Sequence, residues 1–309
     1  MKFTDADLRD KELLAFLGEQ ESVDVDWGTK FREEFLDEMQ NGSVVQGDRL
    51  PWSEYDDKIG FAPGEITVHT GLNGHRKSMV VNQMMGWFAL RGARVGVMSF
   101  EMPIRHTMKR LCLQMAGTRN PTQQFVEQWL AWNHERICYY DKRDTTPAVR
   151  VMAAASHMGQ NLGCRHIVID SLMKCGLPYG EGSAVKEFID VLTDTARAFN
   201  FHIHLVAHAR KPEKGGDDYI PNRYDVLGAS EITNLAHNCV IHWANTRKEK
   251  ILQSGKTPTA EDQKHLDKPC QLFIVDKQRN GAWKGIIGLT HHESMQLHRG
   301  KVLKPRIEP

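Results

Sequence analysis

The chain has 309 residues, enough for one large domain or for a domain with a smaller appendage. Its 40 Lys and Arg residues balance 39 Asp and Glu residues, which excludes binding to nucleic acid through a globally basic surface. No run of about 18 apolar residues occurs, and the charged start "MKFTDADLRD" is not typical of a signal peptide. We therefore expect a cytoplasmic protein without a membrane segment, whose six Cys residues stay reduced because they form no C-x-x-C pair.

Residues 1–45 are acidic and predict a helical N-terminal extension. Two stretches have helical character, "DLRDKELLAFL" and "TKFREEFLDEMQNG". In the second, Phe31, Phe35 and Met39 recur at i, i+4 and i+8, which places them on one face of a helix. Such a face is too small to form a core alone, so we expect the extension to pack on its own domain or on a neighbouring subunit.

From about Gly60 onward, runs typical of strands alternate with runs typical of helices. Strands are expected at "EITVHTG", "ARVGVMSFE", "RHIVIDSL" and "FHIHLVAHA", and helices at "SMVVNQMMGWFALRG", "HTMKRLCLQMAG", "PAVRVMAAASHMGQNLG" and "VKEFIDVLTDTARAFN". This order predicts an α/β fold over residues 46–309, with a doubly wound, mostly parallel sheet flanked by helices. Three later strands, "CVIHWANT", "CQLFIVDKQ" and "WKGIIGLTHH", should end the sheet as antiparallel or edge strands. The charged segment between the first two is expected to be an exposed insertion.

Residues 71–78, "GLNGHRKS", nearly spell the phosphate-binding loop G-x-x-x-x-G-K-[ST]. The segment follows a predicted strand and precedes a predicted helix, which is the context that such a loop requires. Lys77 would then reach the phosphates of a nucleotide, and the Ser78 hydroxyl would bind Mg²⁺. The loop itself would be formed by Gly71, Asn73, Gly74, His75 and Arg76.

Arg76 is the one departure from this motif, because it replaces the second glycine. We expect Gly74 to supply the turn with positive φ. Arg76, at the start of the helix, is expected to have an ordinary φ and a side chain directed away from the nucleotide.

Other polar side chains come where apolar strands end. Glu101 ends "VMSFE", Asp170 ends "HIVID", and His208 ends "HLVAH". Because the carboxyl ends of parallel strands meet at one edge of a sheet, these residues and Lys77 should converge on one site, where Asp170 and Ser78 would hold Mg²⁺. A purely structural interpretation stays open, in which Glu101 only caps a strand and His208 is a core histidine.

Six motifs in this order resemble the RecA-like motor domain of hexameric replicative DNA helicases of the DnaB type, and more specifically that of phage primase-helicases and mitochondrial Twinkle. They are "LPWSEYDDKIGFAPGEITVHTG" leading into the phosphate loop, "SFEMP", "HIVIDSL", "HLVAHARKP", "DVLGASEITNLAHNCVIHWANT" and "VDKQRNGAWKG". The resemblance covers residues 46–309 and implies hydrolysis of ATP or dTTP with Mg²⁺. It also implies a homo-hexameric ring that moves 5′ to 3′ on single-stranded DNA, a separate primase or polymerase partner, and the host cytoplasm if the protein is phage-encoded.

The resemblance also implies roles for individual residues. Glu101 would orient the attacking water as general base, and His208 would sense the γ-phosphate. Lys277 and Arg279 of "KQR" would act in trans on the nucleotide of a neighbouring subunit, unless they lie on a solvated edge strand. Single-stranded DNA would be held by the loops after the Asp170 and His208 strands, for which the candidate residues are Lys174, Arg210, Lys211, Lys214 and Arg223.

Two other functions are compatible with these motifs. A RecA- or RadA-like recombinase would use the same nucleotide site but form filaments. A degenerate ring or loader that binds DNA without hydrolysis would account for Arg76, although the complete set of hydrolytic residues favours an active enzyme. A histidine metal site, at His202 and His204 or at His291 and His292, is only weakly indicated because no third ligand is suitably spaced.

Overall fold

The computed structural model describes residues 27–41, 45–142, 144–178, 182–212, 216, 219–228, 230–300 and 302–303. The chain divides into two compact units, Met1–Val44 and Val45–Pro309. In the first unit, the short 3-10 helix η2 (Gly28–Phe31) leads into α2 (Arg32–Asn41), where a helix was expected. The other expected helix, "DLRDKELLAFL", lies outside the described residues. None of the helices in the described ranges is long and apolar enough to cross a membrane.

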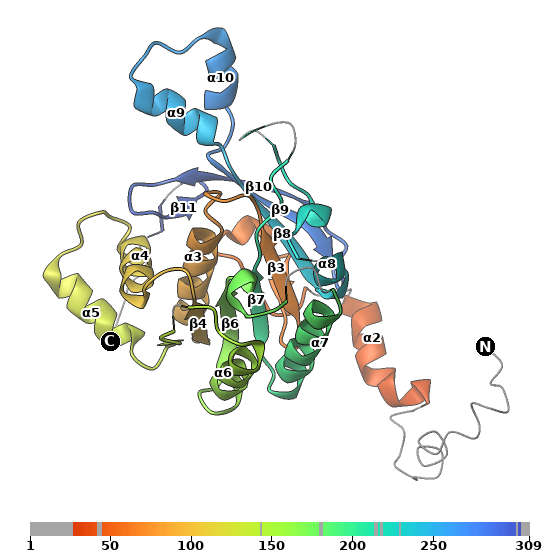
Figure 1. The fold of residues 1–309 in the computed structure, drawn as a ribbon. Coiled ribbons are helices and arrows are strands. Elements are labelled where there is room, and N and C mark those ends of the chain that lie inside the picture. The colour runs from red at the N-terminus through yellow and green to blue at the C-terminus, as the bar shows by residue number, and fades with distance from the viewer. Residues whose placement is uncertain are drawn as a thin grey trace. The chain divides into compact units, whose positions relative to one another are not determined.

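The described part of the second unit is built on a nine-stranded sheet, in the order β11-β10-β9-β8-β3-β7-β6-β4-β5 (Figure 1). Its parallel part consists of β8 (Asn238–Ala244), β3 (Ile66–Thr70), β7 (His202–Val206), β6 (Cys164–Asp170), β4 (Arg94–Ser99) and β5 (Ile137–Tyr139). The antiparallel part consists of β9 (Gln271–Gln278), β10 (Gly285–His291) and β11 (Leu297–His298). The predicted mostly parallel sheet is confirmed. β9 lies between β8 and β10, but its pairing with β10 ends at Val275, so Lys277 and Gln278 of "KQR" pair with β8 on one side only.

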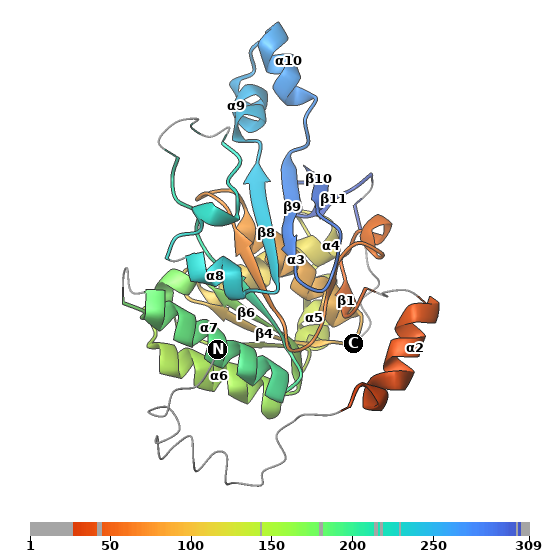
Figure 2. The same ribbon diagram turned by 90° about the vertical axis from the view of Figure 1, so that its right-hand side faces the viewer.

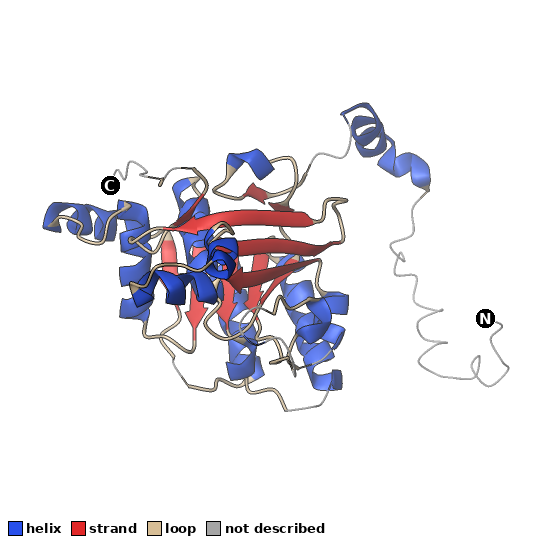
Figure 3. Ribbon diagram, turned by 90° about the horizontal axis from the view of Figure 1, so that it is seen from above, coloured by secondary structure: helices blue, strands red, loops and turns tan. Residues whose placement is uncertain are grey.

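Helices cover both faces of this sheet (Figures 1 and 3). One apolar cluster joins the sheet to α3 (Lys77–Leu90), α4 (Ile104–Ala116) and α5 (Gln123–Asn133). A second cluster, on the opposite face, joins it to α6 (Ala148–Gln160), α7 (Gly182–Ala198) and α8 (Ser230–Leu235). Each face of the parallel strands therefore meets a helix layer, which explains why these strands are buried and mostly apolar.

Smaller elements complete the fold. A separate ribbon pairs β1 (Asp48–Arg49) with β2 (Gly60–Phe61), and three 3-10 turns are η3 (Ser53–Tyr55), η4 (Leu172–Lys174) and η6 (Arg223–Asp225). We did not expect α5 and β5 from the sequence. The signal for α5 was nevertheless present, because the Thr122 side chain accepts a hydrogen bond from the Phe125 N–H (3.2 Å) and caps the helix.

The connection between β8 and β9 forms a helical insertion, α9 (Thr246–Ser254) and α10 (Ala260–Leu266). It projects beyond the ends of the two strands (Figures 1 and 2). Both helices have side-chain caps at their N-termini, from Asn245 and from Thr259. The exposed insertion expected from the charged sequence is confirmed.

A chain of hydrogen-bonded histidines crosses the buried sheet on the face that α3 covers. The Asp48 carboxylate lies 2.9 Å from His166 Nε2, and His166 Nδ1 lies 3.1 Å from His204 Nε2. His204 Nδ1 is 3.1 Å from His69 Nε2, and His69 Nδ1 is 3.0 Å from His242 Nε2. Each inner ring can donate one hydrogen bond and accept one while staying neutral. Burial lowers the pKa of all four rings, that of His69 to about 3.

The same contacts decide the question of a histidine metal site. His202 bonds to the Thr67 hydroxyl (2.8 Å) and to the Ala62 carbonyl (2.6 Å), and His204 belongs to the histidine chain. Within the described ranges, no group of His, Cys, Asp and Glu side chains is arranged to hold a metal ion. These rings therefore hold the sheet together by hydrogen bonding.

We expect the buried histidines to make folding stability strongly dependent on pH. Below the ordinary histidine pKa of about 6.5, each ring binds a proton in the unfolded chain but stays neutral in the folded protein. The free energy of unfolding should then fall with decreasing pH, by up to about 1.4 kcal/mol per pH unit for each ring. Urea unfolding between pH 7.5 and pH 5.0 measures this slope.

Two variants identify the source of the slope. His204→Leu should reduce the slope by the contribution of one proton, which is about 1.4 kcal/mol per pH unit. His106→Gln should leave it unchanged, because His106 is exposed on α4 and its ring faces solvent in both states. A stability that stays flat down to pH 5.0 in the wild type would contradict the neutral histidine chain.

Candidate nucleotide-binding site

The loop of residues 71–76 connects β3 to α3 and lies against the end of β8. A Cβ atom on Gly71 would be 2.3 Å from the His242 carbonyl oxygen, so only glycine fits at this position. Gly74 has a φ of 82°, as expected for the residue that supplies the turn. Asn73 and Gly74 are exposed, whereas His75 is buried. The loop therefore presents its tip to solvent while its base is fixed against β8.

Arg76 differs from the expectation. Its φ of 57° and ψ of 26° are left-handed, so the expected ordinary φ is wrong. The chain needs positive φ here to enter α3, which is the reason that the motif has glycine at this position. A left-handed conformation costs a non-glycine residue about 1–2 kcal/mol. The side chain is directed away, as expected: its guanidinium forms an ion pair with Glu249 of α9 and lies 3.5 Å from the Cys270 carbonyl.

Lys77 and Ser78 form the first turn of α3. The Lys77 ammonium donates hydrogen bonds to the carbonyls of Gly71 (2.8 Å) and Leu72 (3.0 Å), so it lies within the loop. Burial lowers the pKa of Lys77 to about 8. The Ser78 side chain and the carboxylate of Asp170, at the end of β6, line the same small cavity.

Glu101 lies between the ends of three neighbouring strands. Its Oε1 accepts hydrogen bonds from the Ser171 hydroxyl (2.6 Å) and from His208 Nε2 (3.1 Å). These bonds, first that from His208, lower the pKa of Glu101 to about 2, with a smaller contribution from Lys77. Glu101 is therefore ionised at neutral pH. Its bonds join the residues that follow β4, β6 and β7, and the catalytic roles expected for Glu101 and His208 stay predictions.

The pKa of Asp170 is shifted in the opposite direction from that of Glu101. Burial raises the pKa of its carboxyl group, and the Glu101 charge raises it further, while the nearby Ser78 hydroxyl and Lys77 oppose this shift. Two carboxylates and one ammonium thus meet at the carboxyl edge of the sheet. The convergence of Lys77, Glu101, Asp170 and His208 that the sequence predicts is confirmed as geometry.

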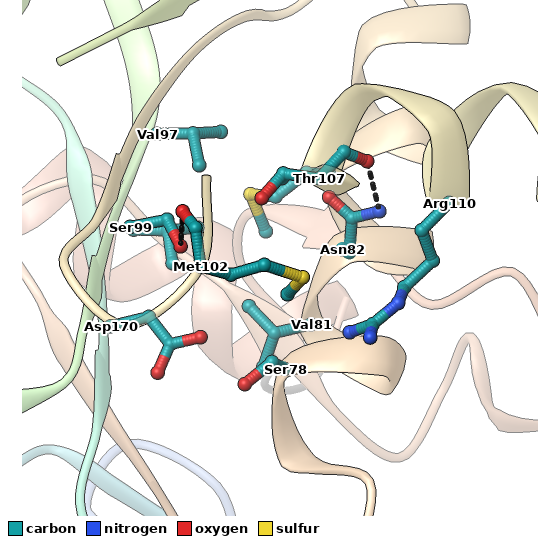
Figure 4. A pocket seen from close by; sticks show the side chains of 11 residues that line it. Ser78, Val81, Asn82, Val97, Ser99, Met102, Thr107, Arg110 and Asp170 are labelled. Atoms are coloured by element: carbon teal, nitrogen blue, oxygen red, sulfur yellow. Dashed lines mark hydrogen bonds between the residues drawn. The ribbon is translucent and has the colours of Figure 1, made fainter. Parts of the chain in front are cut away.

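A cavity of about 20 Å³ lies next to this cluster, between α3 and α4 (Figure 4). This volume is large enough for one water molecule. In Figure 4, Asp170 and Arg110 lie on opposite sides of Ser78. Burial lowers the pKa of Arg110, and the Asp170 carboxylate opposes this effect. Arg110 therefore adds a positive charge near the site.

Sequence motifs did not point to Ser171 or Arg110. Ser171 directly follows Asp170, so its position in the sequence could have predicted that it lies at the site. Arg110 lies in the second half of α4, and only the packing of α4 on α3 brings it to the site.

Lys277 and Arg279, at the end of β9, both contact α8 of the same chain. The Lys277 ammonium donates to the carbonyls of Thr233 (2.9 Å), Asn234 (2.9 Å) and Ala236 (2.8 Å). All three of its hydrogens are thereby used, and they cap the C-terminus of α8. The exposed Arg279 donates through Nη2 to Asn234 (3.1 Å) and Leu235 (3.4 Å).

The expected DNA-contacting residues lie on two loops at the carboxyl edge of the sheet. Arg210 lines a cavity of about 280 Å³ together with Leu172 and Met173 of η4, the turn that ends at Lys174. Lys211 follows and is exposed, whereas Lys214 lies outside the described residues. Arg223 lies on η6, where its guanidinium is 3.9 Å from the Asp276 carboxylate and 5.0 Å from the centre of the Tyr224 ring.

Comparison with known proteins identifies the family. A family model described as an AAA domain matches residues 59–214, a range that contains the loop, Glu101, Asp170 and His208. This chain belongs to the AAA domain family. Among the curated proteins, no sequence matches it.

Two solved structures are similar to this AAA domain over most of its length. One, described as an ATPase domain, superimposes with a TM-score of 0.71 at 13% identity, covering 89% of this chain and 99% of that chain. The other, a DnaB-like replicative helicase solved in a study of its interactions with primase, has a TM-score of 0.69 at 13% identity. That match covers 93% of this chain and 70% of the helicase chain. The predicted RecA-like fold of DnaB-type motor domains is confirmed.

Proposed function

We propose that this chain is the ATP-hydrolysing motor of a ring-shaped replicative DNA helicase. The single observation that supports it best is the cluster in which Glu101 bonds to His208 and Ser171 beside Lys77 and Asp170. An AAA-type fold like that of DnaB-type motor domains agrees with this role. The 5′-to-3′ direction, the hexamer and the choice of ATP or dTTP rest on the family resemblance. The same resemblance suggests a separate primase or polymerase as a partner.

The first turn of α3 and the loop before it would bind the phosphates of the nucleotide. Backbone N–H groups at a helix N-terminus favour anions, and Lys77 would exchange its loop carbonyls for phosphate oxygens. The Ser78 hydroxyl and the Asp170 carboxylate are adjacent oxygen ligands of the kind that Mg²⁺ prefers. When bound there, Mg²⁺ would supply charge neutralisation for the β- and γ-phosphates.

Glu101 would orient the attacking water. With a pKa of about 2 it is a weak base, so it is better suited to accept a hydrogen bond from water than to remove a proton in advance. His208 would link the γ-phosphate to Glu101, because its ring already contacts the carboxylate. A change in nucleotide state could thus reach the loop after β7, where Arg210 and Lys211 are candidates for DNA binding.

We expect Mg²⁺-dependent release of phosphate from ATP or dTTP, stimulated by long single-stranded DNA. Lys77→Ala should abolish turnover because the transferred phosphoryl group loses its cation. Glu101→Gln should keep nucleotide binding and lose about 10²–10³-fold in rate. The exposed Lys186→Ala on α7 is the matched control and should behave as the wild type. A wild-type protein as inert as Lys77→Ala would instead support a non-hydrolysing ring.

Of the two cations at the end of β9, Lys277 and Arg279, we propose that Arg279 acts on the nucleotide of a neighbouring subunit. Lys277 has all three ammonium hydrogens bound by carbonyls of its own chain, whereas Arg279 is exposed and uses one nitrogen of its guanidinium. A guanidinium has five donors, so Arg279 can contact α8 and still bind a phosphate. Lys277 would then position the end of β9.

Arg279→Ala should bind nucleotide almost normally but lose hydrolysis, because an arginine that acts in trans contributes about 10³–10⁵ in rate. Arg94→Ala serves as control, since Arg94 is exposed at the start of β4, and four strands of the sheet lie between β4 and β9. Undiminished DNA-stimulated turnover in Arg279→Ala would refute the assignment. Mixed rings of Arg279→Ala and Lys77→Ala should regain some activity, which would locate the residue at an interface.

We also propose that α2 assembles subunits by binding to a second copy of the chain. Phe35 and Met39 on this helix, and Phe31 at the end of η2 just before it, are 59%, 69% and 49% exposed, respectively. Between α4 and α5 lies a groove of about 540 Å³ with an apolar floor and a basic rim. The floor includes Met108, Leu113, Trp129 and Leu130, and the rim includes Arg105, Lys109 and Arg119. An acidic helix with an apolar face matches this groove in charge and in character.

Phe35→Asp and Leu130→Asp should each shift the protein from oligomer toward monomer in light scattering, because they place a charge on either side of one apolar contact. Leu252→Asp on α9, where Leu252 is 64% exposed, is the control and should not change the oligomer. An unchanged oligomer in Phe35→Asp would contradict assembly through α2. A monomer in Phe35→Asp but not in Leu130→Asp would place the contact elsewhere.

A further inference from the structure

The strained Arg76 is connected to the helical insertion between β8 and β9. A non-glycine residue keeps a left-handed conformation only where its surroundings hold it there. Here the surroundings are the Glu249 carboxylate on α9 and the Cys270 carbonyl just before β9. The Arg76 side chain is 16% exposed and that of Glu249 is 35% exposed, so the pair is partly shielded from solvent.

The neighbouring residues of the loop are tied to the same region. The Gln271 amide donates to the His75 carbonyl (3.2 Å), and the Gly71 backbone lies directly against the carbonyl of His242 on β8. Asn245, at the start of the insertion, donates to the carbonyls of His265 (3.0 Å) and Pro269 (3.4 Å) at its end. The base of the insertion is therefore closed on itself and lies behind the phosphate loop.

We infer that Glu249 is a positioning residue for the nucleotide site and acts through Arg76. It holds Arg76 left-handed, so that the loop follows the path that glycine gives in the ordinary motif, and it keeps the guanidinium on the side away from the phosphates. This inference rests on the proposed nucleotide binding by the loop. The insertion thereby replaces, by a tertiary contact, the conformational freedom that the missing glycine would supply.

Removal of the Glu249 charge has two consequences for the loop. Arg76 can relax toward an ordinary φ, which rotates the peptide groups on either side of it and turns their N–H groups away from the phosphates. The guanidinium, whose side chain is only 16% exposed, also loses the charge that compensates it. Both effects weaken phosphate binding without touching Glu101 or Asp170.

The test is the dissociation constant of the full-length protein for fluorescent mant-ATP with Mg²⁺. Glu249→Gln should weaken binding about tenfold, the factor equivalent to the cost of a left-handed arginine. In turnover assays the KM should rise while kcat at saturation is kept. Glu261→Gln is the matched control, because Glu261 pairs with Arg247 within the same insertion (2.9 Å) and should leave binding unchanged.

The decisive comparison uses Arg76→Gly. Glycine adopts positive φ without strain, so Arg76→Gly should bind at least as tightly as the wild type, and adding Glu249→Gln should then change affinity by less than about twofold. Arg76→Lys provides a second variant, since it keeps the charge but loses the guanidinium fork and should weaken binding as Glu249→Gln does. Circular dichroism confirms that each variant is folded.

Three results would overturn the inference: wild-type affinity in Glu249→Gln, an equal loss when Glu249→Gln is added to Arg76→Gly, or the same loss in Glu261→Gln. A wild-type protein that binds no mant-ATP would refute the proposed function, and this inference with it. Wild-type binding combined with a silent Glu249→Gln would refute the positioning role alone.

Discussion

The central constraint on this fold is a parallel sheet buried on both faces, where a polar side chain has no water to bind. Each buried polar group must then be hydrogen-bonded within the protein, or its desolvation destabilises the folded state. The histidine chain from Asp48 to His242 crosses four adjacent strands and satisfies this rule at its three inner rings, whereas Nδ1 of the last ring, His242, has no partner among the described residues. The hydrogen bonds link strands that are far apart in the sequence, so the chain also fixes how these strands lie against one another.

The same constraint gives the candidate site its electrostatic character. Lys77, Glu101 and Asp170 lie at the edge where the sheet opens to solvent, partly desolvated but close to one another. Burial lowers the pKa of Lys77 and raises that of Asp170, whereas hydrogen bonds from His208 and Ser171 keep Glu101 ionised. Groups that shift in opposite directions within one cluster are typical of functional sites, because each is suited to a different task.

Arg76 shows how a tertiary contact can replace a local sequence rule. The entry into α3 needs positive φ, and glycine would supply it at no cost. Arginine supplies it only because Glu249 and the Cys270 carbonyl hold the side chain from behind. The loop and the insertion are thus linked through this residue. A change in the position of α9 would be transmitted to the residue that precedes Lys77.

Local patterns in the sequence are sufficient to predict the fold class and the order of the site residues along the chain. Apolar strands that end in Glu101, Asp170 and His208 must deliver those side chains to one edge, since parallel strands share a direction. The same local patterns indicated α3 and the exposed insertion, because charge and periodicity act over short distances. The start of α5 was also indicated by a local signal, the capping residue Thr122.

Which distant residues meet is set by the order of the strands in the sheet, and this order is seen only in the three-dimensional structure. The bonds of Glu101 with Ser171 and His208, the contact of Lys277 with α8, and the histidine chain all depend on strand order, which local patterns do not encode. Arg76 is the clearest case. The residue alone favours an ordinary φ, and its left-handed conformation follows from the turn into α3 and from partners that are distant in the chain, Glu249 and Cys270.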